Sequence, residues 1–195
     1  MNKGQLYFMR HCATNFNQTN YISGASDIPI VCHKIDTSNY VHKQNVYIIS
    51  SPLTRCLETV NILCSAIQVS EFVVDKRLQE RDMGMLDGQI RSHAVNQFPN
   101  LFSPGGKFIP TLTPPNGEPY DAFMNRVNAA WLDILNILCD SDVIIVSHNQ
   151  TLKLLYSIIF NLDIRTIWEK LNFDNGKLIP IDYNNAADLH HITFL

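Results

Sequence analysis

The sequence lacks the features that mark several large classes of protein. Its 195 residues include 15 Lys and Arg against 18 Asp and Glu, a formal net charge of −3, so no overall positive field attracts nucleic acid or anionic lipid. No apolar run approaches the roughly 20 residues of a membrane-spanning helix. The apolar stretch that stops at Arg10 is also too short for a secretory signal core. We therefore expect a cytoplasmic globular protein that binds neither nucleic acid nor membrane.

Cysteine is scarce and follows no ligand pattern. The five cysteines are odd in number and include no CxxC pair, which favours reduced thiols over a disulfide framework. The adjacent pairs His11-Cys12 and Cys32-His33 offer metal-ligating side chains, but neighbouring side chains rarely converge on one metal ion. We therefore expect no metal site.

Length and composition indicate a single folded unit. A chain of 195 residues with 46% hydrophobic residues can bury a sizeable core without disulfide or metal support. Proline and glycine gather only between Ser103 and Pro119, where they exclude a regular helix or central strand. We predict one domain over residues 1–195 with a loop-rich lid at about 92–118, because long ordered loops often border binding sites.

Short apolar runs alternate with helical patterns along the chain. Such runs at 6–9, 46–49 and 143–146 are typical of strands buried on both faces. Weaker strand patterns lie near 72–74, 178–182 and 191–194. Helical spacing follows the second strand, after a serine cap and Pro52, and it recurs over about 119–138 and after the third strand. This alternation predicts an α/β fold with a largely parallel sheet.

Basic and imidazole side chains follow three of the predicted strands. Arg10 and His11 end the first strand, the second leads to Arg55, and the third ends at His148. Ligands of open α/β sheets bind outside the carboxyl ends of the strands, and two of these strands also lead into helix N-termini, which favour anions. One such residue could be incidental, but four at corresponding places predict a pocket for a phosphate-sized anion.

The order of these and other motifs resembles a known family. The motifs are Arg10-His11-Cys12-Ala13-Thr14-Asn15-Phe16-Asn17, Gly24-Ala25-Ser26-Asp27-Ile28-Pro29, Ser50-Ser51-Pro52-Leu53-Thr54-Arg55 with Thr59, Leu78-Gln79-Glu80-Arg81-Asp82-Met83-Gly84 with Asp87-Gly88, Asn116-Gly117-Glu118 with Arg126, and Val146-Ser147-His148. Together they span nearly the whole chain and resemble the histidine phosphatase (phosphoglycerate mutase-like) superfamily, in its phosphatase branch. This resemblance implies an α/β three-layer sandwich with a mostly parallel central sheet flanked by helices.

The resemblance also implies a mechanism and a set of site residues. His11 would attack phosphorus as a neutral imidazole and form a phosphohistidine. Glu80 would protonate the leaving oxygen and then activate water, and His148 would act with the arginines on the phosphoryl group. No metal or other cofactor is implied, because arginines supply the positive charge. The implied substrate-binding residues are Arg10, Asn17, Ser23, Gly24, Arg55, Arg81 and Asn149, the last through its backbone N–H.

The chain departs from the family pattern at a few positions. Cys12 and Ala13 replace a glycine and an acidic residue, and Asn149 and Gln150 stand where the family has glycines. Asparagine tolerates a left-handed backbone better than most residues. The segment between 29 and 46 lacks the family's amphipathic helix. For Cys12, two interpretations stay open: a reactive thiol with a lowered pKa beside the arginines, or a buried and inert cysteine.

The sequence favours a metal-independent phosphomonoesterase acting on a small phosphorylated metabolite. One alternative is a phosphoglycerate mutase of the same family, but its substrate carboxylate needs cationic side chains, and Lys107 is the one lysine or arginine between Ser92 and Glu118. The other alternative is a catalytically weak phosphate-binding or scaffold protein. The natural substrate and the oligomeric state stay open from sequence.

Overall fold

A five-stranded sheet forms the centre of the computed structural model, which describes residues 4–41 and 45–183. The strand order is β3-β2-β4-β1-β5. Strands β1 to β4 pair in parallel, and β5 runs antiparallel to β1. The strands are β1 (Leu6–Arg10), β2 (Val46–Ser50), β3 (Glu71–Val74), β4 (Asp142–Ser147) and β5 (Leu178–Ile181). The predicted mostly parallel sheet is confirmed, and the strand predicted near 191–194 lies outside the described residues.

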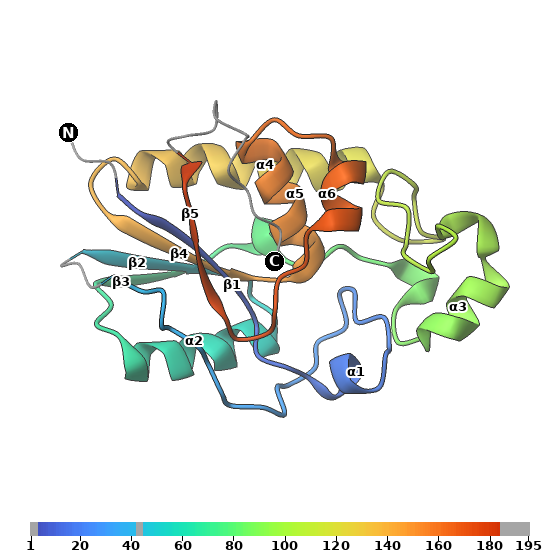
Figure 1. Ribbon diagram of the computed structural model, residues 1–195, viewed down its shortest axis with the longest axis horizontal. Coiled ribbons are helices and arrows are strands. Elements are labelled where there is room, and N and C mark those ends of the chain that lie inside the picture. The colour runs from blue at the N-terminus through green and yellow to red at the C-terminus, as the bar shows by residue number, and fades with distance from the viewer. Residues whose placement is uncertain (1–3, 42–44, 184–195) are drawn as a thin grey trace.

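Helices cover the sheet on both faces, as Figure 1 shows. Helix α2 (Thr54–Ala66) lies on one face, and α4 (Tyr120–Ile137), α5 (Asn149–Ile159) and α6 (Ile164–Lys170) lie on the other. Strand side chains pack against both helical layers. Ile48 lies in one hydrophobic cluster with Leu63 of α2, whereas Ile145 lies in the other with Phe123 of α4. The predicted three-layer arrangement is confirmed, and α4 matches the helix expected over 119–138.

Short elements gather beyond the carboxyl ends of the parallel strands. They are α1 (Asn15–Gln18), α3 (Arg91–Gln97) and three 3₁₀ turns at Lys76–Leu78, Gly84–Leu86 and Pro99–Leu101. Figure 1 shows α1 and α3 on the same side of the molecule. The stretch 103–119 forms neither a helix nor a strand beyond a single bridge between Phe102 and Phe108, as its prolines and glycines predict. None of the described helices is both long and apolar enough to cross a membrane.

The start of α2 differs from the sequence prediction. We expected a serine cap with Pro52 inside the helix, but the helix begins at Thr54 and Leu53 makes no side-chain cap bond. The carboxylate of Asp27 caps this end instead, accepting from the Thr54 backbone N–H at 2.7 Å and from its hydroxyl at 2.9 Å. A distant acceptor thus satisfies the helix terminus, and the Ser51 hydroxyl contacts His148 at 2.7 Å.

Candidate active site

The carboxyl ends of β1 and β4 bring two histidines together. Arg10 lies opposite Ser147 in the register of these strands, and the His11 backbone N–H donates to the Ser147 carbonyl at 3.0 Å. The next residue after each strand is a histidine, and the His11 and His148 ring centroids are 5.2 Å apart. The strand-end pattern of the sequence therefore corresponds to a cluster in space.

The His11 ring is buried and oriented by its own backbone neighbourhood. Its Nδ1 lies 2.7 Å from the Cys12 carbonyl oxygen, and since a carbonyl only accepts, Nδ1 carries the proton of the neutral ring and Nε2 keeps a lone pair. Burial, with the positive charges of Arg55 and Arg10, lowers the pKa of His11 well below its usual 6.5. The ring is therefore neutral at neutral and mildly acidic pH, as a nucleophile requires.

Arg55 and His148 are bonded to one another in the buried centre of the site. The Arg55 Nε donates to His148 Nδ1 at 3.1 Å, so His148 carries its proton on Nε2, which lies 2.7 Å from the Ser51 hydroxyl. A second Arg55 nitrogen donates to the Gly24 carbonyl at 2.9 Å. Burial and the Arg55 charge lower the pKa of His148 well below its usual value, so this ring too is neutral.

Arg10 has a buried donor without a protein acceptor. Its Nη1 donates to the Phe173 carbonyl at 3.0 Å, while its Nε is buried and bonds to no other atom of the described chain. Burial lowers the pKa of Arg10. A buried N–H left unpaired is costly, and a phosphate oxygen is the acceptor that a guanidinium binds best. This orphan donor beside His11 is evidence for an anion-binding pocket.

Asn17 is held by a network that also reaches the backbone of His11. Its Oδ1 accepts from the Thr14 backbone N–H at 3.0 Å, completing a capping box at α1. Asn175 Nδ2 donates to the His11 carbonyl at 2.7 Å and to Asn17 Oδ1 at 3.4 Å. Because the Asn17 carbonyl oxygen is engaged, its amide nitrogen is the group that can face a ligand. Asn175 was missed by the sequence analysis.

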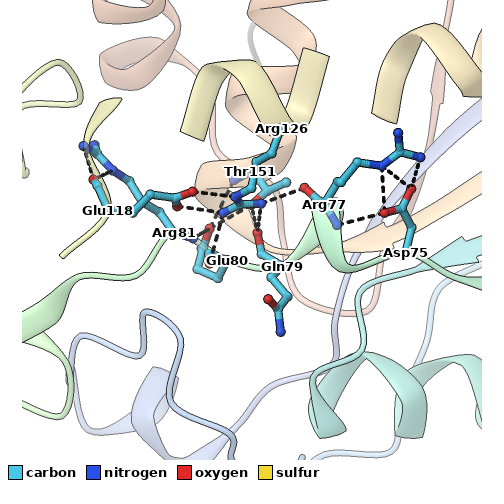
Figure 2. Close-up of polar contacts among 8 residues, drawn as sticks. All are labelled: Asp75, Arg77, Gln79, Glu80, Arg81, Glu118, Arg126 and Thr151. Atoms are coloured by element: carbon cyan, nitrogen blue, oxygen red, sulfur yellow. Dashed lines mark hydrogen bonds and ion pairs between the residues drawn. The ribbon is translucent and has the colours of Figure 1, made fainter. Parts of the chain in front are cut away.

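The Glu80 carboxylate lies against Thr151 at the N-terminus of α5 (Figure 2), the helix whose N-cap residue is His148. Its Oε1 accepts from the Thr151 backbone N–H at 3.2 Å and from the Thr151 hydroxyl at 3.1 Å. Its Oε2 accepts from the Gln150 backbone N–H at 3.2 Å. These donors are the ones that a helix leaves unpaired in its first turn. The carboxyl group is therefore buried and fixed in orientation at the same rim as His11.

Arg126 holds the main chain around Glu80 rather than facing a ligand (Figure 2). Its Nη1 donates to the carbonyls of Arg77 at 2.6 Å and Gln79 at 2.9 Å, and its Nη2 donates to the Glu80 carbonyl at 3.3 Å. The same guanidinium forms a two-pronged ion pair with Glu118, at 2.6 and 2.9 Å. The motif at Asn116-Gly117-Glu118 with Arg126 thus positions the segment that bears the predicted acid.

We expect Arg126→Met to destabilise the protein by about 2–4 kcal/mol, because it leaves Glu118 and several carbonyls without their donor. The matched control is Arg165→Met, which breaks an exposed ion pair with Asp163 and should cost far less stability, because water screens the two charges. Urea unfolding of both variants measures the difference. Equal losses would show that the Arg126 network contributes no more than a surface pair.

The Arg81 guanidinium is bound by carbonyl groups of the surrounding loops. Its buried guanidinium donates to the carbonyls of Pro110 at 2.6 Å, Leu112 at 2.7 Å and Glu118 at 2.9 Å. It also lies over the rings of Phe108 and Phe123, at 5.5 and 5.6 Å. These contacts give no support to the predicted role of Arg81 in substrate binding, which stays a prediction. A buried loop without ladder hydrogen bonds needs donors for its carbonyls, and Arg81 supplies them.

The predicted binding residues Ser23 and Gly24 lie in a turn beside Arg55. The Ser23 carbonyl accepts from the Ser26 backbone N–H at 2.9 Å, and the Gly24 carbonyl accepts from Arg55. Gly24 has a positive φ of 39°, and a Cβ there would lie 1.6 Å from the Asp87 Oδ1. Only glycine fits this approach, so Gly24 lets the turn reach both Arg55 and the segment that follows Glu80.

The side chain of Asn149 is engaged by two neighbouring residues and is not available to a ligand. Its Nδ2 donates to Asn172 Oδ1 at 3.0 Å, and its Oδ1 accepts from the Phe173 backbone N–H at 3.1 Å. The backbone N–H of Asn149 opens α5, where helical N–H groups have no intrahelical partner, so this group can still face a ligand. Asn149 and Gln150 begin an ordinary helix, not a left-handed turn, so the glycines of the family pattern are not needed here.

The thiol of Cys12 has the properties of a buried, inert cysteine. The side chain is fully buried, and its Sγ lies 3.5 Å from the Lys34 carbonyl oxygen. Burial raises the pKa of Cys12, which corrects the interpretation of a lowered pKa beside the arginines. The physical reason is that the loss of hydration of the thiolate on burial outweighs the opposing effect of the hydrogen bond with Thr59.

Asp87 is a second carboxyl group close to the site. Its Oδ2 accepts from the Ala25 backbone N–H at 3.0 Å, whereas its Oδ1 is buried and meets no donor among residues 4–41 and 45–183. Burial, with the nearby carboxyl of Asp82, raises the pKa of Asp87 to about 7. No group of three or more His, Cys, Asp or Glu side chains in the described part of the chain could hold a metal ion.

The raised pKa of Asp87 predicts a pH-dependent effect on stability. A carboxyl group with a raised pKa in the folded state stabilises the protein below its unfolded pKa, and this contribution is lost as the pH rises through the folded value. From about pH 4 to about pH 7, Asp87→Asn should therefore gain stability relative to the unsubstituted protein. Thermal unfolding across this range measures the trend, and the exposed Asp140→Asn is the control. A constant difference at all pH values would contradict it.

Three comparisons with known proteins agree on the family to which the chain belongs. The model of the histidine phosphatase superfamily (branch 1) matches residues 6–190. "Probable phosphoglycerate mutase GpmB" of Proteus mirabilis (strain HI4320) is 27% identical over 213 residues, covering 97% of this chain and 95% of that protein. Among solved structures, Bacillus stearothermophilus YhfR is similar with a TM-score of 0.79 and 22% identity, over 92% of this chain and 91% of that one. The alpha-ribazole phosphatase from Shigella flexneri is similar with a TM-score of 0.72 and 21% identity, over 91% and 90% of the two chains. The chain described here belongs to the histidine phosphatase superfamily.

Proposed function

We propose that this protein is a metal-independent phosphomonoesterase that hydrolyses a small phosphorylated metabolite through a phosphohistidine. The observation that carries the proposal is the pairing of His11 with Arg10. The His11 ring has its Nδ1 committed to the Cys12 carbonyl, and the neighbouring guanidinium keeps a buried Nε–H without a protein acceptor. A neutral nucleophile next to a buried guanidinium N–H that no protein acceptor engages suits attack on a phosphate monoester.

The first half-reaction transfers the phosphoryl group to the protein. The His11 Nε2 lone pair forms a bond to phosphorus while the bond from phosphorus to the leaving oxygen breaks. Arg10 and Arg55 donate to the phosphoryl oxygens and offset their charge, and His148, whose Nε2–H is bound to Ser51, holds the Arg55 guanidinium through its Nδ1. Glu80 in its protonated form gives its proton to the leaving oxygen, so the product departs as a neutral alcohol.

The second half-reaction returns the protein to its starting state. Water attacks phosphorus, Glu80 takes one proton from that water, and the bond from phosphorus to Nε2 breaks. Inorganic phosphate then leaves, and Glu80 is protonated again for the next cycle. The fixed position of Glu80 at the start of α5, held by Thr151 and Gln150, suits both proton transfers.

A mutase of the same superfamily is the competing function, and the 92–118 segment argues against it. A mutase must retain a phosphorylated acid while the phosphate changes position, which favours cationic side chains around the pocket. Lys107 is the one such residue in this segment, and its Nζ is bound to the Glu169 carbonyl at 2.8 Å and to its carboxylate at 3.2 Å. The single lysine of the predicted lid is therefore paired with Glu169 of α6.

Simultaneous measurement of isomerisation and phosphate release separates these functions. The protein is incubated with 3-phosphoglycerate and a trace of the 2,3-bisphosphate, and the same preparation is assayed with para-nitrophenyl phosphate and a panel of phosphorylated metabolites. We expect phosphate release to exceed isomerisation and to be unaffected by EDTA. Isomerisation much faster than release would establish a mutase, and no turnover of any substrate would favour a binding or scaffold protein.

A further inference from the structure

The turn at residues 23–26 supplies main-chain acceptors that hold the Arg55 guanidinium. The Gly24 carbonyl accepts from Arg55 Nη2 at 2.9 Å, and the Ser26 carbonyl accepts from Nη1 at 2.5 Å. The third bond of this group runs from Nε to His148 Nδ1 at 3.1 Å. Because a guanidinium carries five N–H groups, these bonds leave one N–H on each terminal nitrogen for a phosphoryl oxygen. The position of the turn therefore sets the direction of both donors.

A side chain from a distant segment holds this turn. Residues 23–26 belong to no helix or strand, and a hydrogen bond within them joins the Ser26 N–H to the Ser23 carbonyl at 2.9 Å. Asp87 lies 62 residues beyond Ala25 in the chain, and its Oδ2 accepts from the Ala25 backbone N–H at 3.0 Å. Because an irregular segment has no ladder of main-chain bonds, such side-chain contacts fix its position.

The carboxyl group of Asp87 also fits against the turn by its shape. Its Oδ1 is buried and meets no donor in the parts of the chain that the structure describes. This oxygen lies against the Gly24 main chain instead, since a Cβ on Gly24 would be 1.6 Å from it. Asp87 thus touches the turn with both oxygens, one through a hydrogen bond and one through packing. A longer or a shorter side chain would not make both contacts.

The main chain next to Asp87 is itself tied to the chain before the turn. The Gly88 N–H donates to the Ile22 carbonyl at 2.8 Å, and the Ile22 N–H donates to the Gln89 carbonyl at 2.9 Å. These paired bonds fix the segment that follows Glu80 alongside the segment that leads into the turn. The Asp87 carboxyl group is therefore a rigid support for the turn, because both ends of the contact are held by main-chain bonds.

We infer that Asp87 is a positioning residue for phosphate binding, which holds the turn at 23–26 so that this turn aligns the Arg55 guanidinium with the phosphoryl group. The inference rests on the proposed function, which places that group at Arg55. Asp87 acts through the turn and does not touch the substrate. Its length and its acceptor oxygen carry the role, because the bond to Ala25 and the contact with Gly24 depend on those two properties.

Three substitutions at position 87 separate shape from charge. Asp87→Asn keeps the length of the side chain and an oxygen that can accept from the Ala25 N–H, so its affinity for phosphate should stay close to that of the unsubstituted protein. Asp87→Ala removes both contacts, and Asp87→Glu keeps the carboxyl group but adds a methylene where Gly24 leaves no room. Each of these two should weaken phosphate binding by about 10- to 100-fold, the effect of one lost hydrogen bond to a charged group.

Calorimetric titration with inorganic phosphate measures this affinity without turnover. It is carried out at about pH 6, below the pKa of about 7 to which burial raises Asp87, so that the carboxyl group and the amide of Asp87→Asn are both uncharged. The matched control is Asp36→Ala, which should bind phosphate normally. Asp36 is exposed, and its carboxylate likewise accepts from a backbone N–H, that of Ser38 at 3.0 Å.

Circular dichroism checks the fold of every variant, and if Asp87→Ala is unfolded, Asp87→Glu and Asp87→Asn decide the test. Unchanged affinity in folded Asp87→Ala or Asp87→Glu overturns the inference, and so does a loss in Asp87→Asn as large as that in Asp87→Glu. The expected order of affinities in a protein that hydrolyses no phosphate monoester would support the positioning role and contradict the proposed function. An unsubstituted protein that binds no phosphate overturns both.

Discussion

His11→Ala is expected to lose phosphatase activity by about 10⁴-fold or more, because no other group can accept the phosphoryl group in the first half-reaction. The substitution removes the Nε2 lone pair but keeps the backbone bonds to Ser147 and Asn175, so the fold should persist. Steady-state turnover of para-nitrophenyl phosphate gives the measurement. His33→Ala is the control, since His33 is exposed and should retain full activity.

Measuring the same activity as a function of pH tests the electrostatic environment of the nucleophile. Because the pKa of His11 is lowered well below 6.5, its ring stays neutral as the pH falls through that value. Protonation of the nucleophile should therefore not reduce activity until the pH is well below 6.5. Undiminished activity of His11→Ala, or a loss of activity that begins above pH 6.5 on an ionisation of His11, would contradict its assignment.

Glu80→Gln is expected to slow hydrolysis of alkyl phosphates by about 10²–10⁴-fold, since an alkoxide is a poor leaving group without a proton. An aryl phosphate such as para-nitrophenyl phosphate needs little protonation, so its first half-reaction should be affected far less. The glutamine carbonyl oxygen can still accept from Thr151, but its amide nitrogen cannot accept from the Gln150 N–H, so circular dichroism checks the fold of the variant. Comparing the two substrate types within this one variant isolates proton transfer, because any structural change acts on both.

Two controls separate the acid role of Glu80 from a structural one. Glu169→Gln changes an exposed carboxylate that pairs with Lys107 and should leave both substrate types unaffected. Thr151→Val removes the hydroxyl that donates to Glu80 and should cause a smaller loss while preserving the acid. Equal losses for alkyl and aryl phosphates in Glu80→Gln, measured on the phosphorylation step, would count against proton donation.

The parts of the site that sequence predicted share one physical origin. Continuous apolar runs marked β1, β2 and β4, and the residues after them had to emerge at one edge because the strands are parallel. His11, Arg55 and His148 follow directly from that rule, and their mutual contacts need no information beyond strand order. Strand order does not predict their hydrogen-bond partners, because those partners come from segments far away in the chain.

Residues that position the site were missed where tertiary contacts overrode local patterns. Ser51 looked like a helix cap, yet Asp27 takes that role and the serine faces His148. Arg81 looked like a ligand residue because of its place after Glu80, but nearby carbonyls engage its guanidinium. Asn175 had no signal beyond an Asn-Gly pair before β5. Such roles depend on which loop lies opposite, and a single sequence does not specify that pairing.

Direct detection of the phosphorylated histidine tests the central claim. The protein is mixed briefly with para-nitrophenyl phosphate, quenched without acid to preserve the bond from nitrogen to phosphorus, and digested for mass spectrometry. The account predicts a phosphoryl group on His11 in the peptide that contains it, accumulating further in Glu80→Gln because attack by water is slowed, and absent from His11→Ala. Continued turnover with an unphosphorylated His11, or a phosphoryl group found on another residue, would contradict it.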